Sequence, residues 1–207
     1  MTPLSQPTGT CAFNGVTFSG FDEQTITVNH DYPRLVRVYA EQLGLERIAL
    51  ILCNEGSDES VRNAQSGLST CGRWPYVSVY LPWSEPLSCE ALEGVLAHEV
   101  AHLAARDHAS RWSTRRGHRL ASFLWELCRF SPLHRREYRA DRVAQQLVGA
   151  EPLRRLCTEG LTGKRACLTH PSPNARLRRI DRRARNAQTN AEAFAGASGT
   201  ATVTASN

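Results

Sequence analysis

The feature that most constrains the fold is an apolar stretch after Ser88 that contains the pattern His-Glu-x-x-His at residues 98–102. Its apolar residues recur at helical spacing, and serine is a common residue at the N-cap of a helix. They are Leu92, Val95, Leu96, Ala101 and Leu103. We therefore predict a core-facing helix, in which two histidines and a glutamate would be costly to bury without a bound ion.

The spacing of the motif is typical of a zinc site. His98 and His102 lie one helical turn apart on one face, so both imidazoles can bind one ion. Glu99 can face a water molecule that zinc activates, take its proton during attack on an amide, and pass it to the departing amine. Chance matches on solvated helices are common, but the apolar context favours one Zn²⁺ per chain here.

A catalytic zinc site needs a third protein ligand, and His108 is one candidate. It follows His102 at the spacing of the metzincin motif, but Ala105 stands where that motif has glycine. Metzincins also have a methionine beneath the metal, and the only methionine here is Met1. This assignment is therefore the weaker one.

Glu137 is the better candidate. It precedes Asp141 by one helical turn in a segment that is predicted to be helical, so the two carboxylates share a face. One of them can bind zinc while the other supports a ligand imidazole. An isolated pair of this kind would be an ordinary solvated face, but this pair accompanies a motif that lacks its third ligand.

The remaining pattern predicts a mostly helical α+β fold with a small mixed sheet. Apolar spacing and turn residues favour strands at Arg47–Cys53 and Tyr76–Leu81, with loops and an irregular strand between them. The predicted helices are Pro33–Leu43, Gly117–Phe130, Arg136–Val148 and one that begins near Ser172 or Pro173.

Length and composition favour a single folded domain. The 207 residues leave little room for a second core, and we expect one domain over residues 16–185. Residues 1–15 are expected to be flexible and residues 186–207 to form a disordered tail, because both ends have few large apolar groups.

Targeting signals are not evident. The N-terminus lacks a basic region and an apolar run, and no apolar run approaches the roughly 20 residues of a membrane span. We therefore expect a soluble, cytoplasmic protein without a membrane span. The seven cysteines contain no CxxC pair, so free thiols are expected.

Three segments together resemble the gluzincin peptidases of the clan that contains HtpX and the CAAX prenyl proteases. They are residues 92–102 with the His-Glu-x-x-His motif, Glu137–Asp141, and the Thr-His-Pro-Ser run at 169–172 followed by Arg176. A weaker fourth likeness is Asn63-Ala64, where the family has an Asn-Ala pair on the edge strand that faces substrate. Since this chain lacks their membrane spans, it looks more like a soluble catalytic core of that clan.

The resemblance implies a zinc-dependent metalloendopeptidase with a zincin-like fold, in which the sheet lies above the active-site helix. It implies that His98, His102 and Glu137 bind zinc and that Glu99 is the general base. His170 would donate a hydrogen bond to the oxyanion. Asp141 and Arg176 would support the ligands, and the substrate would be a peptide or protein.

Two other functions are weighed against this one. The excess of 25 basic over 20 acidic residues could serve nucleic-acid binding beside a zinc site, but the arginines lack interleaved aromatic residues. We therefore do not expect nucleic acid as a partner. A fold that has lost its activity and serves as a binding protein is disfavoured, because Glu99 is intact.

Overall fold

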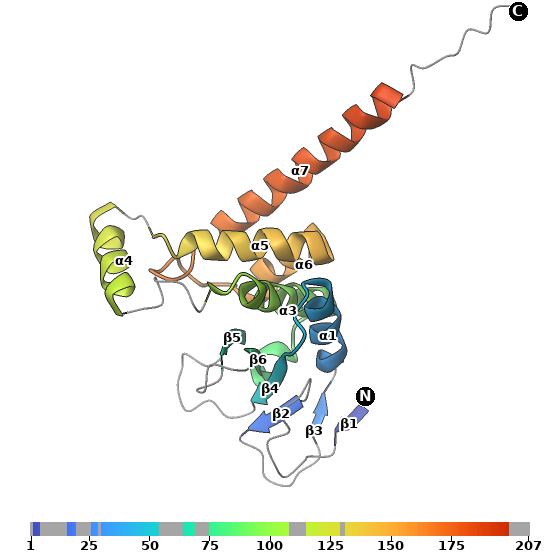
Figure 1. Cartoon of the computed structure of the whole chain (residues 1–207), viewed down its shortest axis with the longest axis vertical. Coiled ribbons are helices and arrows are strands. Elements are labelled where there is room, and N and C mark those ends of the chain that lie inside the picture. Colours follow the sequence, from blue (N-terminus) through green and yellow to red (C-terminus); the bar gives the residue numbers. More distant parts are fainter. Residues whose placement is uncertain are drawn as a thin grey trace, which may run out of the picture.

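The computed structural model describes strands and helices that form a small sheet beneath a group of helices (Figure 1). The described residues are 2–4, 16–19, 26–28, 30–53, 64–68, 75–107, 115–128 and 131–198. The strands are β1 (Thr2–Leu4), β2 (Val16–Ser19), β3 (Ile26–Val28), β4 (Ala49–Cys53), β5 (Ala64–Leu68) and β6 (Pro75–Tyr80). The helices are α1 (Tyr32–Gln42), α2 (Leu81–Ser84), α3 (Cys89–Ala104), α4 (Arg115–Cys128), α5 (His134–Val148), α6 (Ala150–Arg155) and α7 (Pro173–Ser198), with a π-helical turn η4 (Leu156–Gly160).

The main sheet has the strand order β2-β4-β6-β5. β2, β4 and β6 are parallel, whereas β5 pairs antiparallel with β6 and forms one edge. The buried positions of β4 and β6 include Leu52, Val77 and Val79, none of which is exposed to solvent. β1 and β3 form a separate antiparallel pair. This mixed sheet with predominant helix confirms the α+β class.

Helix α3 lies between the sheet and the helices α5 and α6 (Figure 1). It is covered on several sides, which explains why its apolar residues exceed a single stripe. Its N-terminus is capped as predicted, with the Ser88 side chain accepting a hydrogen bond from the Ala91 amide. At Gly94, a Cβ atom would lie 2.3 Å from the carbonyl oxygen of Pro152 in α6, so only glycine allows this close approach.

Most predicted elements occur close to their expected ranges. α1, β4, β6, α4 and α5 start and end within a few residues of the predicted boundaries, and α7 begins at Pro173. The stretch with the irregular strand contains β5, which is regularly paired with β6 from Ala64 to Leu68. The sequence reasoning missed α6 and η4, whose short lengths give too few turns for a periodic pattern.

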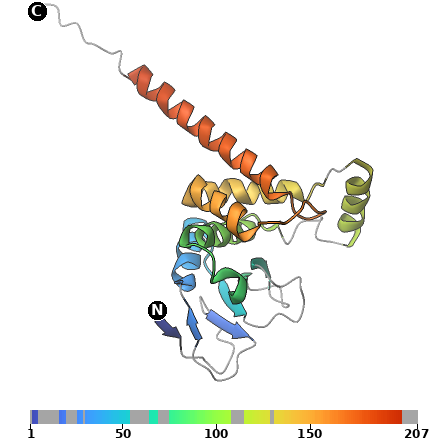
Figure 2. The same ribbon diagram turned by 180° about the vertical axis from the view of Figure 1, so that it is seen from behind.

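The C-terminal segment differs from its prediction. α7 continues to Ser198, so residues 186–198 are helical instead of a disordered tail. Alanine has the highest helix propensity, and this stretch contains several alanines and a Gln188–Glu192 side-chain hydrogen bond of 2.9 Å between successive turns. This part of α7 extends away from the other helices (Figures 1 and 2). Of residues 1–15, only 2–4 are described, as β1.

Among the described residues, no helix combines the length and apolar character required to cross a membrane.

Candidate metal centre

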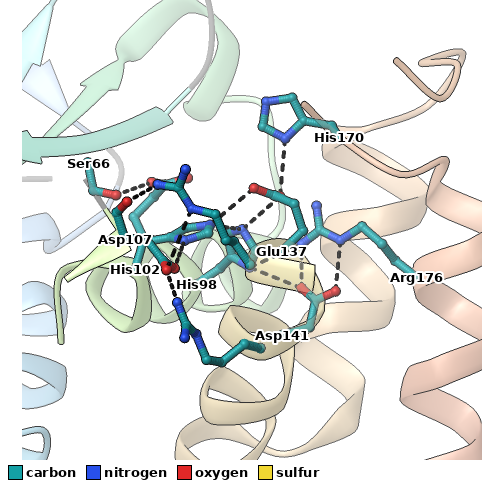
Figure 3. A network of polar contacts seen from close by, with 11 residues as sticks. Ser66, His98, His102, Asp107, Glu137, Asp141, His170 and Arg176 are labelled. Carbon is teal, nitrogen blue, oxygen red and sulfur yellow. Dashed lines mark hydrogen bonds and ion pairs between the residues drawn. The ribbon is translucent and has the colours of Figure 1, made fainter. Parts of the chain in front are cut away.

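Helices α3 and α5 bring two imidazoles and one carboxylate to a common point (Figure 3). The Nε2 atoms of His98 and His102 are 3.1 Å apart. Glu137 approaches both of them, with Oε2 3.4 Å from Nε2 of His98 and Oε1 3.3 Å from Nε2 of His102. His98 and Glu137 are buried, and His102 is half-buried.

These separations fit a tetrahedral zinc ion. Ligand atoms about 2.1 Å from such an ion lie about 3.4 Å from one another, which is close to the three distances observed. The three ligand atoms lie within 4.8 Å of one another, and two imidazole nitrogens with a carboxylate oxygen form a common donor set for catalytic zinc. The residues therefore fit the ion that the motif predicts.

Asp141 supports His98 at the ring nitrogen that does not face Glu137, because Asp141 Oδ1 lies 3.0 Å from His98 Nδ1. With Nε2 directed at an ion, the proton of a neutral His98 is on Nδ1 and is donated to Asp141. Arg176 in α7 donates to both oxygens of Asp141, at 3.0 Å from Nε and 2.5 Å from a terminal nitrogen.

The charges in this pair stabilise each other in the protein interior. Burial alone would raise the pKa of the Asp141 carboxyl, but the Arg176 charge and the His98 hydrogen bond outweigh burial and lower the pKa to about 2. The same opposition acts at Glu137, where hydrogen bonds from His102, His170 and His98 outweigh burial and lower the pKa. Both carboxylates are therefore ionised at neutral pH.

Asp107 supports the second histidine and was not predicted from the sequence. Its Oδ2 atom lies 2.8 Å from Nδ1 of His102, and its carboxylate is buried. Arg136 donates to the backbone oxygen of Asp107 and Arg139 to its Oδ1. The only hint in the sequence is an acidic residue soon after the motif, which is too common a feature to identify a partner.

The backbone after α3 explains how Asp107 reaches His102. The helix ends at Ala104, and Arg106 takes a positive φ of 51°, in the left-handed region. A residue other than glycine costs about 1 kcal/mol or more there. This turn reverses the chain so that the Asp107 side chain faces back toward the helix.

Glu99 lines a cavity together with His98 and Glu137, and it is held by the edge strand. The hydroxyl of Ser66 in β5 donates to Glu99 Oε2 over 2.8 Å. The cavity has a volume of about 300 Å³, and its apolar wall includes Trp83, Val95 and Leu156. Trp83 is held in turn by a hydrogen bond of 3.3 Å from its indole nitrogen to the carbonyl oxygen of Gly160.

His170 lies at the same cavity, in the segment that precedes α7. Its Nδ1 atom is 3.1 Å from Glu137 Oε2, and 63% of its side chain is exposed. The hydrogen bond to Glu137 raises the pKa of His170 more than burial lowers it. The second ring nitrogen is not used in this contact.

Two residues from the sequence reasoning fall outside the described part of the chain. They are Asn63 and His108. The structure therefore does not test His108, the alternative candidate for the third zinc ligand. Ala64, the neighbour of Asn63, begins the edge strand β5 and lines the cavity.

Comparison with models of known protein families gives a match. The sequence model of peptidase family M48 matches residues 66–130, from within β5 to just beyond α4, and so includes the His-Glu-x-x-His motif. No curated protein and no solved structure matches the chain. The family match implies a zinc-dependent hydrolase that acts on peptides or proteins. The predicted resemblance to the HtpX and prenyl-protease family of zinc metallopeptidases is thereby confirmed, since residues 66–130 of this chain match peptidase family M48.

Proposed function

We propose that this chain is a zinc metalloendopeptidase with a zincin-like fold, in which His98, His102 and Glu137 bind one zinc ion per chain. The observation that carries the proposal is the spacing of their three ligand atoms, from 3.1 to 3.4 Å, beside a carboxylate that faces a cavity. A single domain over residues 16–185 and a cytoplasmic location are part of the same proposal.

Glu99 is the general base in this proposal. A zinc ion in the site would polarise the carbonyl of the scissile bond and lower the pKa of a water molecule beside it. Glu99 takes a proton from the water as the water attacks the carbonyl carbon, and then gives that proton to the departing amine. Since Ser66 already donates to Oε2 of Glu99, the other carboxylate oxygen is left to accept this proton.

The surrounding residues orient these groups. Asp141 and Asp107 accept hydrogen bonds from the Nδ1 atoms of His98 and His102, which keeps both Nε2 atoms directed at the ion. Arg176 neutralises Asp141 in the interior. The exposed ring of His170 donates from its Nε2 atom to the oxyanion that forms on the substrate carbonyl.

The edge strand gives a means of aligning the substrate. β5 pairs with β6 on one side only within the described sheet, so an extended peptide can add to its other side through main-chain hydrogen bonds. A peptide there would pass Ser66 and Glu99, with an apolar side chain in the cavity beside Trp83. A substrate bound in this way extends on both sides of Glu99, so the bond that is cleaved would lie within the peptide, as expected of an endopeptidase.

The test combines metal content with proteolysis. Purified wild type is expected to contain one zinc per chain by elemental analysis and to cleave casein or itself. Glu137→Ala should lose most of the zinc, whereas Glu99→Gln should keep the zinc and lose activity by at least about a thousandfold. Glu90→Gln in the exposed first turn of α3 is the matched control and should keep both.

Two results would contradict the proposal. Wild type that binds no zinc, after dialysis against a zinc buffer, would rule out the metal site. One zinc per chain without cleavage of any peptide in a diverse library would favour the alternative of a binding or nucleic-acid-associated protein that has little or no peptidase activity.

A further inference from the structure

A second cavity lies between α5 and α7, and it is lined largely by arginines. Its volume is about 610 Å³, and it is separate in its lining residues from the cavity beside the metal centre. We name it the arginine groove and define it by Arg135, Arg139, Arg142, Arg179, Arg183 and Tyr138. Among the described residues that line it there is no aspartate or glutamate.

The groove is built on a firm contact between the two helices. Arg183 in α7 donates to the Tyr138 backbone oxygen at 3.1 Å and to Gln145 Oε1 at 3.2 Å, both in α5. Gln145 in turn donates to the backbone oxygen of Ile180 over 3.1 Å. The Arg179 guanidinium lies over the Tyr138 ring, 3.8 Å from its centroid. These contacts fix the arginines of α7 against those of α5.

Two arginines of the groove, Arg179 and Arg183, make no ion pair within the described part of the chain. Arg139 reaches the Asp107 carboxylate, but Arg183 donates to an amide and a backbone oxygen, and Arg179 packs on an aromatic ring. Burial, together with the nearby charges of Arg179 and Arg142, lowers the pKa of Arg183 although Asp141 opposes this effect. Bringing these like charges together is unfavourable, and a bound anion would remove that cost.

We propose that the arginine groove binds a compact ligand with a chain of phosphate groups. Guanidinium groups match phosphate oxygens through two parallel hydrogen bonds, and several arginines from two helices can hold successive phosphates. A volume of about 610 Å³ is in the range of small-molecule sites and is too local to follow a nucleic-acid backbone. The Tyr138 ring and its cation contact add a surface for a planar group beside the phosphates.

The site does not depend on the proposed peptidase activity. It lies on α5 and α7, which also carry Glu137 and Arg176. A ligand that contacts both helices would therefore also fix the position of Arg176 relative to Glu137. Binding itself is measured without substrate, and its failure leaves the zinc and proteolysis experiments unaffected.

Isothermal titration with inorganic tripolyphosphate and with ATP, both free of magnesium, tests the proposal. Wild type is expected to bind one molecule per chain, more weakly as salt rises. Arg142→Gln with Arg179→Gln removes one exposed charge from each helix and should weaken binding by roughly a hundredfold. Arg178→Gln with Arg182→Gln removes two exposed charges from α7 outside the groove and should change it less than threefold.

The relative affinities for tripolyphosphate and ATP distinguish a simple phosphate chain from a nucleotide. Equal binding of tripolyphosphate and ATP would support a phosphate-chain site, and tighter binding of ATP would support a nucleotide with its base on Tyr138. No saturable binding of either probe, or equal losses in the groove and control variants, would overturn the proposal. Tight binding of DNA or RNA oligonucleotides, with phosphate chains bound only weakly, would overturn it in favour of a nucleic-acid surface.

Discussion

Asp107 Oδ2 lies 2.8 Å from Nδ1 of His102. The contact links the turn after α3, which carries Asp107, to a histidine of the candidate metal centre within α3. The equivalent contact on the other half is Asp141 Oδ1 with Nδ1 of His98, at 3.0 Å. Each imidazole thus has a carboxylate behind it, which fixes the ring orientation and raises the basicity of Nε2.

Asp107→Asn is expected to weaken zinc binding by about 10- to 100-fold, because the hydrogen bond from His102 loses a charged acceptor. The measurement is competition against a chelator at constant pH. Asp181→Asn, which removes a surface carboxylate paired with Arg154, is the control and should leave zinc affinity unchanged. Equal zinc affinities of Asp107→Asn and wild type would show that this contact does not orient His102.

Ser66→Ala is expected to lower kcat by roughly tenfold with little change in KM or zinc content, because Glu99 loses the hydrogen bond that positions it. Steady-state kinetics on a short peptide separate the two constants. Ser66→Thr keeps a hydroxyl and suits a strand, so it should restore most of the rate. If Ser66→Thr is as slow as Ser66→Ala, the hydroxyl is not what positions Glu99.

Arg176→Met is expected to lower the free energy of unfolding by about 3–5 kcal/mol, because it leaves the Asp141 carboxylate buried without its partner. Urea unfolding of the zinc-free protein measures the effect. In Arg176→Met with Asp141→Leu, both charges are absent, and the loss should be smaller than the sum of the two single losses. Additive losses would indicate that the two residues act independently.

Cysteine reactivity should differ between the interior and the surface. Burial raises the pKa of the Cys157 thiol to about 11, so at pH 8 its thiolate fraction is small and its alkylation should be at least about a hundredfold slower than that of an ordinary thiol. Cys167 is exposed, and hydrogen bonds from Thr169 and His170 outweigh the effect of burial and lower its pKa.

Mass spectrometry after timed treatment with iodoacetamide distinguishes the two thiols, and unfolding in urea should abolish the difference. Cys89, which is also exposed, provides an internal reference for an accessible thiol. Rapid labelling of Cys157 in the folded protein would contradict its buried position.

The local sequence determined those features that depend on contacts one or two turns apart. The spacing of His98 and His102 places both imidazoles on one helical face, and the Ser88 cap and apolar periodicity define the start and orientation of α3. The same short-range rules gave the positions of β4, β6 and α5. They failed for residues 186–198, where high helix propensity sustains α7 although the side chains of residues 186–194 are exposed.

The tertiary structure decided which distant groups meet at the site. Sequence spacing shows that Glu137 and Asp141 share a face, but only the packing of α5 on α3 directs Glu137 to the two Nε2 atoms and Asp141 to Nδ1 of His98. The contact of Ser66 with Glu99 depends on the pairing of β5 with β6, and that of Asp107 with His102 depends on the left-handed turn at Arg106. Such contacts arise from chain reversals and from helix and strand packing. A periodic pattern in the sequence does not predict them.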